Sequence, residues 1–302
     1  MKVVDPATLA YFTDDHPTGV LAQRYLFVGE DNTPDNFMFS IAENRGHFHM
    51  VRHRHSFDQF RFGIEGDLEM GNGRKLREGC LGYFPEGTPY GPQDDQAGPV
   101  TLVLQFGGSS GYGYLSPQQY RDGRAALKKI GRFEGPVFIR EMPDGTVRKT
   151  FSINAIWEEA LGAKMLLPAP RYDQPIFIDP RAFRWVPVEG APGALHKPLG
   201  TFSEREVRAG LWHVAPGASL RLTSGESRIL VLVLEGTGKA AVGQPLARHF
   251  GVQVDPGEKV IVAADTELTL LSFDMPPVEK AWTAPMLPSF EPVPGESVQD
   301  PV

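Results

Sequence analysis

Residues 52–60 read Arg-His-Arg-His-Ser-Phe-Asp-Gln-Phe, and this stretch decides how the whole chain is interpreted. Side chains two residues apart in a β-strand point to the same face of the sheet. His53 and His55 are therefore expected on one face, with the two arginines on the other. Gln59, four residues after the second histidine, is expected to enter the same interior from the next strand. Together these side chains could bind one metal ion.

The segment around this stretch, from Arg24 to Gln105, alternates short apolar runs with turn-forming residues. Regularly spaced runs of this kind predict the strands of an antiparallel sheet. The pairs Asn72-Gly73 and Asp94-Asp95 tolerate tight turns. We therefore expect an all-β barrel or sandwich. The runs are RYLFVGE, FMFSIAE, FRFGIEG, GYFPEG and VTLVLQF.

Two spaced patterns in this segment resemble the signatures of the cupin superfamily. The histidine pair is followed by Gln59 and then by Gly66, as in the first signature. Gly79, followed by Pro85 and Gly87, resembles the second signature, a glycine and then Pro-x-Gly. Both patterns occur in the expected order, which makes the joint resemblance far more specific than either pattern alone.

The resemblance covers about residues 24–110 and implies a jelly-roll barrel, also called a double-stranded β-helix. It further implies one divalent metal ion, with His53, His55 and Gln59 as ligands. Iron is the first choice for this ion, and zinc, nickel or manganese are alternatives. A pocket without metal that binds a sugar or an acid is the other interpretation of the same residues.

The sequence departs from the cupin pattern at two ligand positions. Gln59 stands where a glutamate is usual, and Tyr90 stands where the third histidine is usual. A phenol has a pKa of about 10 and must lose its proton to bind a metal strongly. Metal affinity should therefore be weaker than in a site with three histidines, and Tyr90 is either a ligand or a proton donor. His49 is an alternative third ligand, but on a straight strand it would lie about 13 Å from His53.

The sequence also predicts where the side chains of Arg61, Gln105 and Cys80 lie in the barrel. Arg61 shares the parity of Gln59 in the sequence and is expected to project into the barrel, where a guanidinium suits a substrate with a carboxylate. Gln105 is expected to line the same interior from the following strand. Each has a plainer alternative, a local ion pair for the arginine and a surface amide for the glutamine. Cys80 is expected to be a buried, inert thiol.

A second strand-rich block toward the C-terminus predicts a second barrel whose site has been lost. When the blocks are aligned on their shared Glu-Gly, Thr223, Gly225 and Ile229 stand opposite the two histidines and the glutamine. A second alignment places Ala263 and Leu268 opposite the proline and the tyrosine of the second signature. We therefore expect an apolar second barrel that packs against the first.

These patterns divide the chain into four parts. Residues 1–115 are expected to form the N-terminal barrel, and residues 116–200 a helix and an irregular connector. The helix should begin at Ser116, because serine followed by proline is a typical helix start. Residues 201–284 are expected to form the degenerate C-terminal barrel, followed by a Pro-rich tail over residues 285–302.

Composition excludes several classes of partner. The formal net charge of −7 opposes binding to nucleic acid. No run of 18 apolar residues predicts a membrane span, and the N-terminal stretch is too acidic for a signal peptide. The single cysteine excludes an internal disulfide. We expect a cytoplasmic monomer or homodimer that binds a small molecule.

The function expected from these observations is that of a metal-dependent enzyme acting on a small oxygenated organic molecule. An oxygenase with non-heme iron is the first hypothesis. A redox-neutral lyase or isomerase acting on a sugar acid is the second. A small-ligand-binding protein without catalytic activity is the third.

Overall fold

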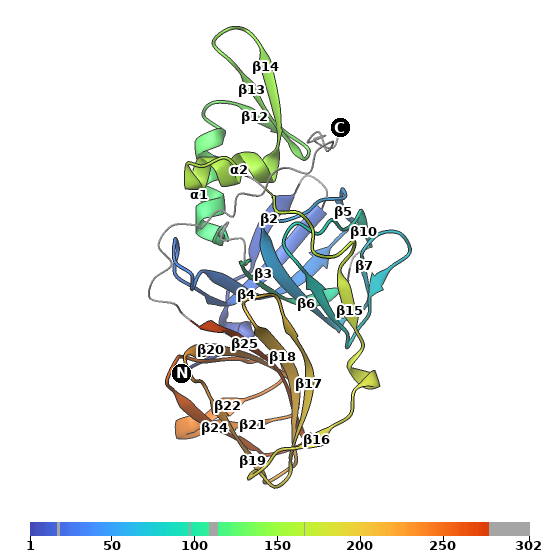
Figure 1. The fold of residues 1–302 in the computed structure, drawn as a ribbon, viewed down its shortest axis with the longest axis vertical. Helices are drawn as coiled ribbons and strands as arrows, with labels where there is room; N and C mark the ends of the chain where they lie inside the picture. Colours follow the sequence, from blue (N-terminus) through green and yellow to red (C-terminus); the bar gives the residue numbers. More distant parts are fainter. Residues whose placement is uncertain (17–18, 97, 109–113, 166, 278–302) are drawn as a thin grey trace.

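The structure is a computed structural model that describes residues 1–16, 19–96, 98–108, 114–165 and 167–277 (Figure 1). Most strands belong to two seven-stranded antiparallel sheets. Each sheet forms the main wall of a barrel, and the two barrels lie one against the other, the first blue and cyan and the second mainly orange in Figure 1. The expected all-β architecture of two jelly-roll barrels is confirmed. The tail expected over residues 285–302 lies outside the described residues.

The first large sheet has the strand order β15-β9-β6-β11-β4-β3-β2. Two short strand pairs, β5 with β10 and β7 with β8, lie beside it (Figure 1). The strands are β2 (Phe12–His16), β3 (Gly19–Val28), β4 (Phe37–Arg45), β5 (Phe48–Met50), β6 (Phe57–Glu65), β7 (Leu68–Glu69), β8 (Lys75–Leu76), β9 (Leu81–Phe84), β10 (Gln93–Asp95), β11 (Val100–Gly107) and β15 (Ile176–Ile178).

The second large sheet has the order β1-β23-β20-β25-β18-β17-β16, and a four-stranded sheet, β19-β24-β21-β22, forms the other wall of its barrel. The strands are β1 (Lys2–Val4), β16 (Val186–Pro187), β17 (Ala194–Phe202), β18 (Val207–Val214), β19 (Ser219–Thr223), β20 (Ser227–Glu235), β21 (Gly238–Ala240), β22 (Gln244–Leu246), β23 (Gly251–Val254), β24 (Lys259–Ala264) and β25 (Leu268–Pro277).

Three strands cross the boundaries expected from the sequence. β1 lies in the segment expected to form the first barrel, but it pairs with β23 of the second sheet. β15 lies in the expected connector and pairs with β9 of the first sheet. β17 begins at Ala194, before residue 201, where the second barrel was expected to begin. These are pairings between residues far apart in the sequence, which the local pattern of apolar residues does not reveal.

The connector forms a small unit that projects from the first barrel (Figure 1). The helix α1 (Pro117–Leu127) begins as expected, because the Ser116 side chain accepts a hydrogen bond from the Gln119 N–H and completes a capping box. In the described part of the chain, no helix has the length and apolar character needed to cross a membrane. The other elements are β12 (Arg132–Glu134), β13 (Val137–Glu141), β14 (Val147–Phe151) and α2 (Ser152–Leu161).

The two large sheets pack face to face, and the main hydrophobic core lies between them. Side chains alternate along β6, so Phe60 and Phe62 enter this shared core while Gln59 and Arg61 face the opposite way. The ring centroid of Phe60 lies 5.2 Å from that of Phe273 on β25. One face of β6 therefore joins the barrels, and the other lines the interior of the first barrel.

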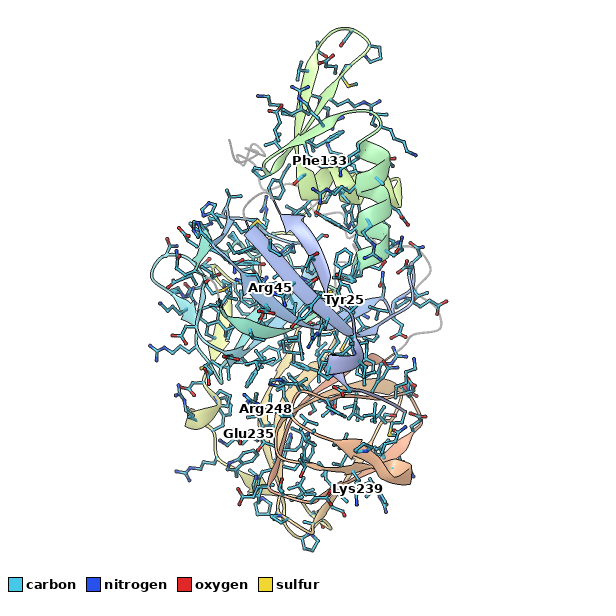
Figure 2. All side chains as sticks on the ribbon, turned by 180° about the vertical axis from the view of Figure 1, so that it is seen from behind. Tyr25, Arg45, Phe133, Glu235, Lys239 and Arg248 are labelled. Atoms are coloured by element: carbon cyan, nitrogen blue, oxygen red, sulfur yellow. The ribbon has the colours of Figure 1, made fainter. Side chains whose placement is uncertain are left out.

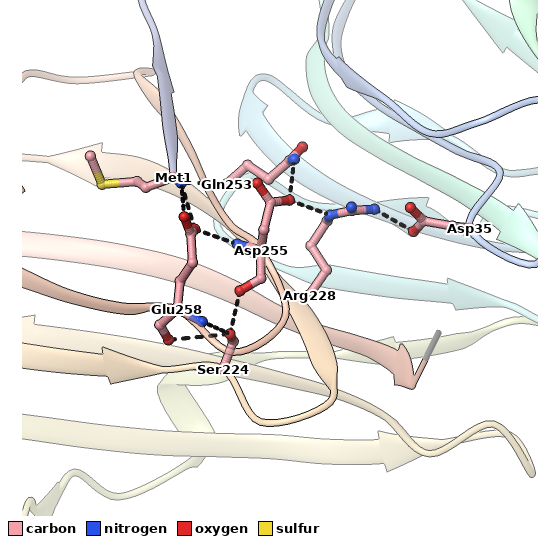
Figure 3. A network of polar contacts seen from close by, with 7 residues as sticks. All are labelled: Met1, Asp35, Ser224, Arg228, Gln253, Asp255 and Glu258. Atoms are coloured by element: carbon pink, nitrogen blue, oxygen red, sulfur yellow. Dashed lines mark hydrogen bonds and ion pairs between the residues drawn. The ribbon is translucent and has the colours of Figure 1, made fainter. Parts of the chain in front are cut away.

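A network of charged and polar side chains also joins the barrels (Figure 3). Arg228, at the start of β20, forms an ion pair with Asp35 of the first barrel and a second one, 3.0 Å long, with Asp255. The Arg228 side chain is only 13% exposed. Such a partly buried pair favours one relative placement of the two barrels. Figure 2 shows the side chains of both barrels and of the projecting unit from behind, with Tyr25, Arg45, Phe133, Glu235, Lys239 and Arg248 labelled.

Candidate metal centre in the first barrel

The two histidines lie in an irregular segment before β6, not on one regular strand as expected. His53 forms an isolated antiparallel bridge with Tyr90, in which each backbone N–H donates to the other carbonyl at 3.0 and 2.9 Å. The rings of His53 and His55 nevertheless lie edge to face, with centroids 4.9 Å apart. The bridge brings the two signatures together.

The expected phenol contacts the second histidine, and the expected amide contacts the phenol. The Tyr90 hydroxyl lies 2.9 Å from Nε2 of His55. The amide of Gln59 donates to the same hydroxyl at 3.4 Å, and the amide of Gln105 donates to Oε1 of Gln59 at 2.6 Å. Gln59 is fully buried, and Gln105 is partly exposed. Four sequence-predicted residues therefore form one hydrogen-bonded chain inside the barrel.

These contacts define where each imidazole carries its lone pair. Nδ1 of His53 lies 2.8 Å from the Val51 carbonyl, which can only accept, so Nδ1 carries the proton. Because Gln59 donates to Tyr90, the Tyr90 O–H is left to donate to Nε2 of His55. Nε2 of His55 therefore carries the lone pair, and in His53 Nε2 is the ring nitrogen left for a metal ion.

Burial keeps His55 and Tyr90 uncharged. Desolvation holds the pKa of His55 well below its usual value, and the charges of His53 and Arg61 lower it further. Desolvation also raises the pKa of Tyr90, which is 4% exposed. The apolar walls come from Phe57, whose ring stacks on His55 with centroids 4.3 Å apart, and from Phe84, 4.8 Å from the Tyr90 ring. The phenol therefore keeps its proton at neutral pH.

The other sequence-predicted residues lie as follows. Arg61 projects into the barrel beside Gln59, as expected, with its guanidinium carbon 6.0 Å from the centroid of the Tyr90 ring. Cys80 is buried, and burial raises its pKa. His49 lies on β5 opposite Asp94, in a small sheet separate from the bridge that holds His53.

A surface cavity of about 460 Å³ lies near β5 and contains none of the predicted ligands. Its lining includes His47, Glu69 and Asp94, and His47 forms an ion pair with Asp94. Among the described residues, no cluster of three His, Cys, Asp or Glu side chains is placed to hold a metal ion. The candidate site is not such a cluster, because two of its four donor groups are the amide of Gln59 and the phenol of Tyr90.

Sequence reasoning missed a buried charged group behind the site. The turn Pro85-Glu86-Gly87 belongs to the second signature, and the Gly87 N–H donates to the His55 carbonyl at 2.7 Å. Glu86 is fully buried and accepts from Arg171 of the connector at 2.7 Å, while its own N–H donates to Asp58 at 2.9 Å. Burial, together with the charge of Glu86, raises the pKa of Asp58 to about 7. A charged residue inside a Pro-x-Gly turn was the signal that could have revealed this group.

The donor set fits a divalent ion. Each imidazole has Nε2 as its candidate metal-binding atom, the Tyr90 phenol contacts Nε2 of His55, and the Gln59 amide contacts that phenol. Nδ1 of His55 is a buried nitrogen with no hydrogen-bond partner within the described residues, so hydrogen bonds hold this ring from one side only. The set lacks a carboxylate, so its affinity should be lower than that of a site with three histidines and a glutamate.

Strand pairing in the second barrel corrects the alignment expected from the sequence. Val254 pairs with Ile229 as Phe84 pairs with Gln59, so Ile229 does occupy the position of the glutamine. Counting on from Val254 along the chain places Asp255 at the position of Pro85, and Val260 rather than Leu268 at that of Tyr90.

The position of His53 is corrected in the same way. Leu222 pairs with Val260 as His53 pairs with Tyr90, so Leu222 rather than Thr223 occupies that position. The alignment failed because the connections between these strands differ in length in the two barrels. The conclusion drawn from it holds, since Leu222, Ile229 and Val260 are buried and apolar.

Comparisons with known proteins support the fold. No family model matches the sequence, and no curated protein sequence matches it. The structure is similar to that of a provisionally assigned dioxygenase from Nostoc punctiforme, with a TM-score of 0.62 and 11% identity, covering 93% of this chain and 84% of that one.

Two further solved structures are similar. Streptomyces albus HEPD, with 2-hydroxyethylphosphonate and Fe(II) bound, has a TM-score of 0.56 and 14% identity over 91% of this chain and 76% of its own. Oxalate decarboxylase from Bacillus subtilis has a TM-score of 0.52 and 14% identity over 91% and 77%. These likenesses show the two-barrel jelly-roll fold that the resemblance of the two signatures implied.

Proposed function

We propose that this two-barrel cupin is a metal-dependent enzyme whose N-terminal barrel acts on a small oxygenated organic molecule. The observation that carries the proposal is the pair of imidazoles, His53 and His55, which lie edge to face in the barrel. Tyr90 contacts His55, and Gln59 contacts Tyr90. His53 and His55 would hold the ion through Nε2, and Gln59 would complete the set. Iron is our first choice of metal.

A bound divalent ion would supply positive charge and open coordination positions for an oxygen-bearing substrate. Because Nε2 of His55 would bind the ion, the Tyr90 O–H that donates to this nitrogen would instead be free to supply a proton to the substrate, and this hydroxyl stays protonated at neutral pH. Gln105 holds the amide of Gln59 in place. Phe57 and Phe84 restrict the access of water to these groups.

Metal analysis tests this proposal directly. The protein is loaded with Fe(II) or Mn(II) and desalted, and its metal content is measured. We expect about one equivalent in the wild type and a loss of most of it in the double variant His53→Ala, His55→Ala. The matched control is His47→Ala, His49→Ala, which removes two histidines outside the site and should retain the metal. Full metal content in the His53, His55 variant would contradict the proposal.

Two reaction classes are then distinguished by dioxygen uptake. An oxygenase loaded with Fe(II) consumes dioxygen together with its substrate, as tested with a panel of small hydroxy and keto acids. A lyase or isomerase converts the acid without consuming dioxygen. The second class is favoured by one observation, the buried phenol with a raised pKa, which suits a proton transfer. Binding without turnover in either assay would identify a protein that only binds its ligand.

A further inference from the structure

Arg61 is a charged side chain on the inner face of the first barrel. It lies on β6 between Val103 of β11 and Gly82 of β9. Its guanidinium carbon lies 5.7 Å from the centroid of the Phe84 ring and 6.0 Å from that of Tyr90. The guanidinium is therefore next to the phenol that contacts His55.

The charge of Arg61 has no acidic partner in the described part of the chain. None of the ion pairs described involves Arg61, and its Nε is buried without a hydrogen-bond partner. Two other partly buried arginines are paired with two carboxylates each, Arg171 with Glu86 and Glu204, and Arg228 with Asp35 and Asp255. Arg24, whose Nε is also buried without a hydrogen-bond partner in the described part of the chain, lies over the Tyr11 ring. A guanidinium taken out of water without a counter-charge is costly, so a protein retains one where something else pairs with it.

Asp95 is within electrostatic range of Arg61 but does not serve as its partner. Both carboxylate oxygens of Asp95 are already used, one by the Asn44 side chain at 3.1 Å and the other by the Glu69 N–H at 2.6 Å. These contacts fix the loops around β7 and β10. The carboxylate is buried at 2% exposure and lies beyond ion-pair distance of the guanidinium.

The groups beside Arg61 are neutral and able to bind oxygen atoms. Gln59 and Gln105 are amides, and Tyr90 is a protonated phenol. Arg61, His55 and Gln105 are each partly exposed, so the group is not fully closed off from solvent. A guanidinium presents two parallel N–H donors that match the two oxygens of a carboxylate.

We propose that Arg61 is the anion-binding residue of the first barrel and that its ligand is a small organic acid. The carboxylate of this acid pairs with the guanidinium, and a second oxygen, from a hydroxyl or carbonyl group, reaches Tyr90 and Gln59. The inference deepens the proposed function by naming the substrate class of the same site. The inference rests on the proposed function only in treating the bound acid as a substrate. Binding of the acid to Arg61 itself requires no metal.

Calorimetry on the metal-free full chain tests the inference. The probes are glycolate, pyruvate and 3-hydroxypropionate, with glycolamide as an uncharged analogue and inorganic phosphate as an inorganic anion. We expect at least one of the three acids to bind the wild type, and glycolamide to bind at least tenfold more weakly. Arg61→Met should weaken binding of that acid at least tenfold, and Arg61→Lys should restore part of it. Arg52→Met, which removes an exposed arginine nearby in the sequence, should leave it unchanged.

Three results would overturn the inference. One is that none of the three acids binds the wild type. Another is that Arg61→Met binds them as the wild type does, and the third is that phosphate or glycolamide binds as tightly as the acids. The double variant His53→Ala, His55→Ala separates this inference from the proposed function. If this variant still takes up metal in the loading experiment while acid binding to the metal-free wild type requires Arg61, the metal proposal fails and the anion site stands.

Discussion

The two barrels share one hydrogen-bonded framework and differ in what fills it. In the first barrel, β6 presents Gln59 and Arg61 to the interior, whereas the matching strand β20 of the second presents Ile229 and Val231. The bridge of His53 with Tyr90 has its counterpart in the apolar pair Leu222 and Val260. The second interior is a continuous core of aliphatic side chains.

This difference separates stability from function within one chain. The aliphatic interior is close-packed, so it stabilises the second barrel without needing hydrogen-bond partners. The polar interior must satisfy each of its groups, and some, including Nε of Arg61 and Oγ of Ser40, lack a partner among the described residues. Such groups cost stability, and proteins keep them mainly at functional sites.

The largest effect on stability is expected when an arginine is placed in the interior of the second barrel, at the position that Arg61 occupies in the first. Val231 is fully buried, and Val231→Arg should lower the free energy of unfolding by at least about 4 kcal/mol, because the charge has no partner there. Urea unfolding of the purified protein measures this loss. Val231→Met is the control for size, with an expected loss of about 1–3 kcal/mol. Equal stability of the two variants would show that the second interior accepts polar groups.

A smaller effect is expected when the contact between the barrels is weakened. Arg228→Met removes the cation shared by Asp35 and Asp255, and we expect a loss of about 2 kcal/mol, since the group is buried only in part. Arg132→Met is the control, because Arg132 pairs with Glu134 on the surface at 58% exposure. Thermal unfolding should show one transition for the wild type. If Arg228→Met unfolds like the control, the charged network does not hold the barrels together.

A gain in stability, rather than a loss, is expected when the charge of Arg61 is removed from the interior of the first barrel. Arg61→Met should raise the free energy of unfolding of the metal-free, ligand-free protein by about 1 kcal/mol, because it removes a charge that has no partner. Urea unfolding without added acids measures the gain. A loss of stability would instead identify Arg61 as a structural residue, and the contrast between the two interiors would be weaker than described.

The smallest effect concerns Asp274, which occupies the position of Gln105 in the second barrel. Burial raises the pKa of Asp274, and the charge of Arg208 opposes this. The folded state therefore binds the proton more tightly than the unfolded state, whose pKa is about 3.9. The stabilisation from this proton is complete below that pKa and is lost as the pH rises through the folded pKa.

Asp274→Asn removes this dependence. Relative to the wild type, the variant should gain stability as the pH is raised from 4 to 7 and then remain constant. Thermal unfolding across this range measures the difference, with Asp265→Asn, at an exposed position, as the control. If the difference in stability between Asp274→Asn and the wild type does not change with pH, Asp274 is more solvated than the structure indicates.

Local patterns were sufficient to predict the barrel class and the members of the site. The strands of the first barrel are marked by short apolar runs with turn residues between them, and this information lies within a few residues. The spacing of the histidine pair, Gln59 and the second signature identified side chains that the structure brings into contact. The inward position of Arg61 followed from its parity with Gln59.

Only the tertiary structure decided which distant groups complete each interior. The expected strand through His53 and His55 is replaced by a single bridge to Tyr90, and Arg171 reaches Glu86 across 85 residues of sequence. The register of the second barrel also differed from the sequence alignment. Parity along a strand determines which face a side chain takes, but not which strand lies beside it. Register and partners depend on packing between segments far apart in the chain, and a local pattern carries no information about that packing.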